Sequence, residues 1–164
     1  VPVVAIGVCY NGDFDAGEQV LRPLRAFGPP LADEIRPMAY CQVQTLFDAA
    51  FVRGHRYYFK SNLMQRISDG AIDVLIERFP TIPSPLSLVY FEQLGKAANR
   101  VGATATAFSH RDALCDWGCD AVWLDPAADG VHIEWTRALA EAMRPFTMGS
   151  DYAPHIGLET DEGA

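Results

Sequence analysis

The chain of 164 residues has the length of one ordinary domain, and its 49% hydrophobic and 21% charged residues are typical of a globular protein. A formal net charge of −8 argues against nucleic acid and anionic membrane surfaces as partners, because phosphate binding requires a basic patch. No run approaches the roughly 18 apolar residues that suggest a membrane span.

Both ends of the sequence look cut from a longer chain. The first residue is not Met, no signal-like region follows it, and the sequence stops in a charged stretch, residues 159–164. Any localisation signal would therefore lie outside these residues. We expect residues 1–164 to form a single domain that is a fragment of a longer protein.

The first third of the chain is predicted to hold a strand and two helices. Residues 3–9 are rich in β-branched side chains and are followed by a turn signal, which indicates a strand. Asp15 can cap a helix that Pro23 should kink or end. The apolar residues between positions 42 and 51 suggest a second, short helix.

The middle of the chain predicts a strand followed by the clearest helix. Residues 56–61 are aromatic and favour a strand. Ser68 opens a helix whose apolar residues recur at helical spacing. These residues are Ile72, Leu75, Ile76 and Phe79.

Three further strands are predicted at residues 86–94, 104–110 and 115–123, and a last helix at residues 131–144. Because only turns separate these strands, they must pair antiparallel. The sequence therefore predicts an α+β fold, in which helices pack on one face of an antiparallel sheet.

The predicted strand 115–123 separates two kinds of side chain. Alternation places Trp117 and Trp123 on the face beneath the helices, and Asp116 and Asp120 on the other. Gly118 lies between the two carboxylates, where its missing side chain leaves room for something flat to approach. This second face is either a solvated surface or a ligand-binding one.

The four cysteines do not predict a metal site or a disulfide. Cys115 and Cys119 would share a strand face but lie about 13 Å apart, too far for a disulfide. A Cys-x-x-x-Cys pair alone is a weak zinc signal. We expect all four to be buried small side chains or free thiols.

Several segments, in the right order, resemble the berberine bridge enzyme family of FAD-linked oxidases. Phe91-Glu92-Gln93-Leu94-Gly95-Lys96-Ala97 is similar to a family strand that ends in a glycine pair and a small residue. Thr106-Ala107-Phe108-Ser109-His110-Arg111 is similar to the family's Thr-Ala-Phe-x-His-Arg segment. Trp123 with its acidic turn, Trp135-Thr136-Arg137 and Gly149-Ser150-Asp151-Tyr152-Ala153-Pro154-His155 resemble three further motifs.

The resemblance implies a substrate domain whose open sheet face meets the flavin of a second domain. That FAD-binding domain, with the histidine and cysteine that can link covalently to flavin, is missing from this sequence. The chain departs from the family pattern at Lys96, which replaces a glycine, and at Pro154, which replaces an asparagine. We expect FAD to be bound mainly by the missing domain, and the isolated chain to be inactive.

The resemblance also implies roles for individual residues. Asp116 falls on an acidic catalytic position, where it would be a base or would help a tyrosine or histidine to act as one. Desolvation would raise its pKa, which suits a base near neutral pH. Tyr152 and His155 fall where the family contacts flavin and substrate, and a histidine can take a hydroxyl proton at neutral pH. Tyr152 and Pro154 are the expected cofactor contacts.

Further assignments come from position along the predicted elements. Tyr90 and Gln93 could line a substrate pocket or be ordinary sheet residues, and His110 is a further candidate. Arg111 is expected to pair with a carboxylate or carbonyl in a turn. We interpret His55 and His132 as surface residues and Trp135 as core.

The predicted function is the substrate-binding part of an FAD-dependent oxidoreductase. It would oxidise a sugar, an alcohol or a secondary metabolite, with a base removing the hydroxyl proton and hydride passing to flavin. The alternative is a stand-alone α+β module that binds a ligand or dimerises without catalysis.

Overall fold

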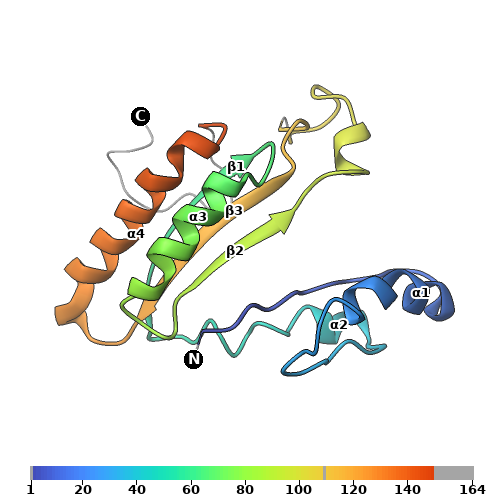
Figure 1. Ribbon diagram of the computed structural model, residues 1–164, viewed down its shortest axis with the longest axis horizontal. Helices are drawn as coiled ribbons and strands as arrows, with labels where there is room; N and C mark the ends of the chain where they lie inside the picture. The colour runs from blue at the N-terminus through green and yellow to red at the C-terminus, as the bar shows by residue number, and fades with distance from the viewer. Residues whose placement is uncertain (1, 109, 150–164) are drawn as a thin grey trace. The chain divides into compact units, whose positions relative to one another are not determined.

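The computed structural model describes residues 2–108 and 110–149. The chain divides into two compact units, Val1–Ala50 and Phe51–Ala164. The candidate residues that the structure describes all lie in the second unit. Its sheet and helices make the fold α+β, as predicted (Figure 1).

The first unit contains two helices, α1 (Phe14–Arg25) and α2 (Tyr40–Val43). Asp13, rather than Asp15, caps α1 by accepting a hydrogen bond from the backbone N–H of Ala16 at 3.0 Å. Pro23 lies in the last turn, so the helix ends two residues later. The second helix is shorter than predicted, because residues 44–50 form turns.

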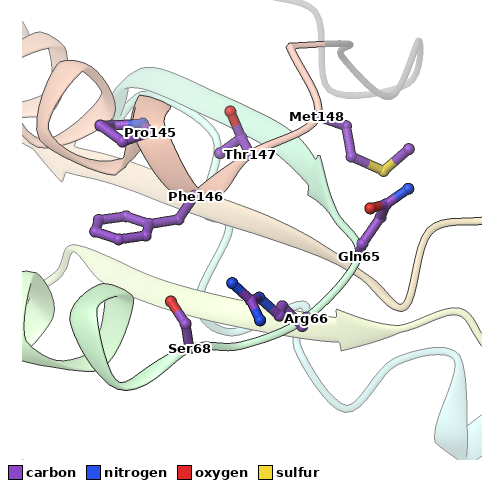
Figure 2. A pocket seen from close by; sticks show the side chains of 7 residues that line it. All are labelled: Gln65, Arg66, Ser68, Pro145, Phe146, Thr147 and Met148. Carbon is purple, nitrogen blue, oxygen red and sulfur yellow. The ribbon is translucent and has the colours of Figure 1, made fainter.

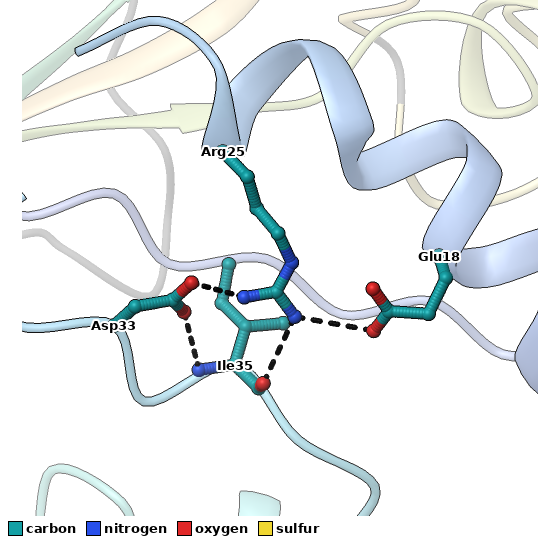
Figure 3. A network of polar contacts seen from close by, with 4 residues as sticks. All are labelled: Glu18, Arg25, Asp33 and Ile35. Carbon is teal, nitrogen blue, oxygen red and sulfur yellow. Dashed lines mark hydrogen bonds and ion pairs between the residues drawn. The ribbon is translucent and has the colours of Figure 1, made fainter. Parts of the chain in front are cut away.

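The predicted strand at residues 3–9 is wrong, since the structure describes no strand there. Strand propensity reflects side-chain packing on a paired sheet, and no strand is described in the first unit. Order in this unit comes partly from Arg25, which donates to Glu18 and to the carbonyl of Ile35 at 3.1 Å each, and pairs with Asp33 (Figure 3).

The second unit is built on a three-stranded antiparallel sheet within the part of the chain that the structure describes. The strands are β1 (Arg56–Met64), β2 (Leu88–Gln93) and β3 (Cys115–Trp123), in the order β1-β3-β2. All three were predicted to within a few residues, and β3 to the residue. The last strand in sequence is therefore the middle strand in space.

Two helices pack on one face of this sheet (Figure 1). They are α3 (Asp69–Arg78) and α4 (Asp129–Met143). Ser68 caps α3 through the N–H of Ala71, as predicted. The core between helices and sheet contains Met64, Ala71, Cys115, Trp117, Cys119, Leu139 and Met143.

The face of α3 that packs on the sheet differs from the predicted stripe. Ile72 and Ile76 are 42% and 68% exposed, whereas Ala71 is fully buried and Val74 and Leu75 pack against the core. Both sets have helical spacing, so periodicity alone could not choose between them. The residues that pack toward the sheet are Ala71, Val74 and Leu75, beginning at the small side chain of Ala71.

The predicted strand at residues 104–110 is also wrong. Its described residues form turns and irregular structure, held by Arg111. The guanidinium donates to the carbonyl of Ala98 at 2.9 Å and to the hydroxyl of Thr106, and lies over the ring of Phe108. The described chain also contains short 3-10 helices: Phe79–Thr81, Ala98–Arg100, Pro126–Ala128 and Arg144–Phe146.

Candidate active site

Asp116 lies on β3 and faces away from the helices, as predicted. Its register partners are Leu63 on β1 and Glu92 on β2. Asp120 shares this face, while Trp117 and Trp123 are 1% and 4% exposed on the helix side. Asp116 itself is fully buried, so this part of the second face is not a solvated surface.

Gly118 leaves a gap between the two carboxylates, and the ring of Tyr90 fills it. A Cβ atom added to Gly118 would lie 2.3 Å from both Cζ and the hydroxyl oxygen of Tyr90. The sequence predicted that something flat would approach this glycine. In the structure that flat group is a side chain of the protein.

The phenol of Tyr90 keeps its proton over the neutral pH range. Burial raises the pKa of Tyr90 well above 10, and the nearby carboxylates of Asp120, Asp116 and Glu92 raise it further. Tyr90 can therefore act as a hydrogen-bond donor on this face, but it is unsuited to act as a base.

Ser61 is a member of this face that the sequence did not single out as a site residue. It lies on β1 directly opposite Gly118, whose other register partner is Tyr90. Its hydroxyl oxygen is buried and has no hydrogen-bond partner among the described residues. The sequence alone could not identify Ser61 as part of this face, because its position there depends on how β1 pairs with β3.

Two of the predicted substrate-binding residues do not occupy strand positions on this face. Gln93 is opposite Cys115, so its side chain belongs to the helix side of the sheet. His110 lies in the loop before β3, where its ring meets that of Phe108 edge to face. Arg111 binds a backbone carbonyl in the same loop, as predicted.

Tyr152, Pro154 and His155 lie outside the described residues. The chain just before them is placed by Met148, whose backbone N–H donates to the carbonyl of Leu63 at 2.8 Å. Leu63 is the residue opposite Asp116. The described chain is thus fixed beside Leu63, on the opposite side of β1 from Asp116, one residue before the Gly149–His155 motif begins.

A hollow of about 390 Å³ lies between the chain that follows β1 and the chain that follows α4 (Figure 2). Its lining residues are Gln65, Arg66, Ser68, Pro145, Phe146, Thr147 and Met148. Gln65 and Ser68 also have structural roles, since Gln65 donates to Asp112 at 3.0 Å and Ser68 caps α3. The predicted site residues that the structure describes do not line this hollow.

A second polar cluster lies where β3 meets α4. Asp129 receives two hydrogen bonds from Arg56 at 2.5 Å each and one from the indole of Trp123 at 2.8 Å. His132 stacks on Trp123, with ring centroids 4.7 Å apart and planes 8° from parallel. His132 is only 5% exposed, so its prediction as a surface residue is wrong.

The cysteines of β3 are core residues. Among the described residues all four cysteines are free, with Cys115 and Cys119 buried. Burial raises the pKa of both thiols, that of Cys119 to about 12. Protonated buried thiols are poor nucleophiles, so neither is a candidate catalytic group.

The described residues contain no group of three or more His, Cys, Asp or Glu side chains that could hold a metal ion. None of the helices described in the structure is long and apolar enough to cross a membrane. The polar side chains described on the Asp116 face include the carboxylates of Asp116, Asp120 and Glu92, the phenol of Tyr90 and the hydroxyl of Ser61.

No protein-family model matches the chain. An uncharacterized FAD-linked oxidoreductase of Bacillus subtilis, YgaK, is 25% identical over 144 residues, which cover 87% of this chain and 32% of that protein. The chain thus spans about a third of this curated relative.

Solved structures show the same fold. BBE-like 1 of Physcomitrella patens has a TM-score of 0.72 at 17% identity, over 88% of this chain and 35% of that one. Berberine bridge enzyme of Eschscholzia californica has a TM-score of 0.58 at 20% identity, over 63% and 22%. The chain is therefore similar in sequence and structure to the substrate-side portion of BBE-like FAD-linked oxidoreductases.

Proposed function

We propose that this chain is the substrate-binding portion of an FAD-dependent oxidoreductase that oxidises a hydroxyl group of a small molecule. The observation that carries the proposal is the fully buried carboxylate of Asp116 on the face opposite the helices. A buried carboxylate is costly to maintain and is a frequent mark of a functional site. The likeness to FAD-linked relatives supplies the reaction class.

Asp116 is the proposed base, which takes the proton from the substrate hydroxyl as hydride leaves the carbon atom. General-base assistance of this kind is worth about 10² to 10⁴ in rate. Tyr90, which keeps its proton, donates a hydrogen bond to a substrate oxygen. Tyr152 and His155 remain proposed contacts to flavin and substrate, and His155 is the alternative base.

The described residues offer no phosphate-binding loop for the adenine dinucleotide part of FAD. The glycines near the starts of α3 and α4, Gly70 and Gly130, are isolated and form no glycine-rich phosphate loop. A Cβ at Gly70 would meet the ring of Phe146 at 2.9 Å, so that glycine serves packing. We therefore propose that a separate domain binds most of the FAD, which supplies the hydride acceptor.

The test is anaerobic reduction of the flavin-containing protein of which we propose this chain is a part. A panel of sugars, alcohols and phenols is mixed with the oxidised protein, and the flavin absorbance is followed. At least one hydroxyl compound should bleach the flavin. If dithionite reduces the flavin and no hydroxyl compound does, the proposal is wrong, and a non-catalytic binding or dimerisation module becomes the better account.

A further inference from the structure

One row of residues crosses all three strands on the face that carries Asp116. Ser61 on β1, Gly118 on β3 and Tyr90 on β2 are in register, so their side chains stand side by side. The middle position has no side chain, and the Tyr90 ring leans into its space. The row therefore presents a serine hydroxyl and a phenol on either side of a glycine.

The hydroxyl of Ser61 differs from the other serine hydroxyls around the sheet. Ser87 receives a hydrogen bond from the backbone N–H of Val122 at 2.9 Å, and Ser84 receives one from the N–H of Leu86 at 3.2 Å. The Ser61 hydroxyl is buried without a partner among the described residues. Leaving a buried hydroxyl unsatisfied destabilises a fold, so such groups call for an explanation.

The position of Ser61 places this hydroxyl near the proposed base. Leu63, two residues further along β1, is directly opposite Asp116. Ser61 and Asp116 are therefore diagonal neighbours on one face, with Cα atoms about 7–8 Å apart in such pairs. This spacing is short enough for one small molecule to contact both side chains.

We infer that Ser61 is a substrate-contacting residue, whose hydroxyl forms a hydrogen bond with an oxygen atom of the molecule that Asp116 deprotonates. The inference rests on the proposed function and deepens it, because it requires a substrate with a second oxygen near the reacting hydroxyl. Diols, sugars and hydroxy ketones meet this requirement, and simple monoalcohols do not.

The test compares Ser61→Ala with the matched control Ser87→Ala, first by denaturant unfolding of the chain. The Ser61→Ala midpoint should equal or exceed that of the parent, because a group without a protein partner is removed. Ser87→Ala should lower the midpoint, because it removes hydrogen bonds to Val122. A lowered midpoint for Ser61→Ala would assign the hydroxyl a structural partner and overturn the inference.

The second part measures flavin reduction in the flavin-containing protein, with the best substrate of the panel. Ser61→Ala should raise KM roughly three- to tenfold and leave kcat nearly unchanged, the pattern for loss of a neutral hydrogen bond formed equally in ground and transition states. An unchanged KM would overturn the inference while the proposed function stands. If the parent protein is not reduced by any hydroxyl compound, the proposed function fails and the inference fails with it.

Discussion

Gly118 and Tyr90 show what a strand pattern can and cannot predict at the scale of single residues. Period-2 alternation placed Asp116, Gly118 and Asp120 on one face, and the structure confirms it. That the Tyr90 ring would fill the space at Gly118 was not predictable. Tyr90 lies on β2, and the pairing of β2 with β3 cannot be read from the sequence of β3. Ser61 was missed for the same reason.

Because the Tyr90 ring lies so close to Gly118, we expect a side chain at position 118 to destabilise the fold. Gly118→Ala would bring a methyl group to 2.3 Å from the phenol ring, so either the ring or the strand must move. We expect a loss of about 1–3 kcal/mol in unfolding free energy, typical of overpacking. The measurement is a double-mutant cycle with Tyr90→Ala, in whose background Gly118→Ala should cost much less; equal costs in both backgrounds would disprove the contact.

We expect His132 to make the free energy of unfolding depend on pH. Burial lowers its pKa from the usual 6.5, although the Asp129 carboxylate partly opposes that shift. Below about pH 6.5 the unfolded chain therefore binds a proton that the folded chain takes up only at lower pH. The free energy of unfolding should be greatest above this pH and fall as the solution is acidified toward pH 5.

Denaturant unfolding between pH 7.5 and pH 5 tests this dependence. His132→Gln should flatten the slope of unfolding free energy against pH, because it removes the histidine whose pKa burial lowers. Asp129 acts in a different window, because Arg56 lowers the pKa of its carboxyl below 3.8 and that contribution is lost only in stronger acid. An unaltered slope in His132→Gln would show that another group titrates.

At the scale of elements, the sequence predicted those that carry the sheet and its helices. Strand β3 and the cap of α3 were identified because alternation, apolar spacing and a capping serine agreed with one another. The segments at residues 3–9 and 104–110 have β-branched or alternating side chains, and the structure describes no strand pairing for their placed residues. Pairing is a tertiary property, and propensity alone overestimates strands where it is lacking.

The two central helices allow a graded test of the core. Leu139 on α4 is 1% exposed, so Leu139→Ala should lower the unfolding free energy by roughly 2–5 kcal/mol. Leu75 is only partly buried, so Leu75→Ala should lower the unfolding free energy by less than Leu139→Ala does. Ile76 is 68% exposed, so Ile76→Ala is the control and should change the unfolding free energy by no more than about 0.5 kcal/mol. Equal losses at Leu139 and Ile76, measured by urea unfolding, would contradict this assignment of the core face.

At the scale of the whole molecule, the fold class and the likeness to FAD-linked relatives both followed from motifs spread along the second unit. The substrate could not be predicted, because specificity depends on side chains that strand register brings together, and register is not contained in the sequence of any one strand. The same likeness covers only about a third of the relative's length, in keeping with our proposal that a separate domain binds most of the FAD.

The isolated chain should therefore not retain flavin through purification. No glycine-rich phosphate loop occurs in its sequence, so the adenine and pyrophosphate would have no binding site. Absorbance near 450 nm after gel filtration measures any bound flavin. A yellow protein with stoichiometric flavin would show that the chain binds the cofactor by itself.

The most direct test of the account compares Asp116→Asn with Asp120→Asn in the flavin-containing protein. The two residues share a strand, a face and a charge, but their Cα atoms are about 13 Å apart along β3, too far for both to serve one reacting atom. Stopped-flow measurement of flavin reduction, with both variants confirmed folded, should show a rate lowered by about 10² or more for Asp116→Asn and far less for Asp120→Asn. Equal rates, or the larger loss at Asp120, would contradict the assignment of Asp116 as the base and direct the search to His155 or Tyr152.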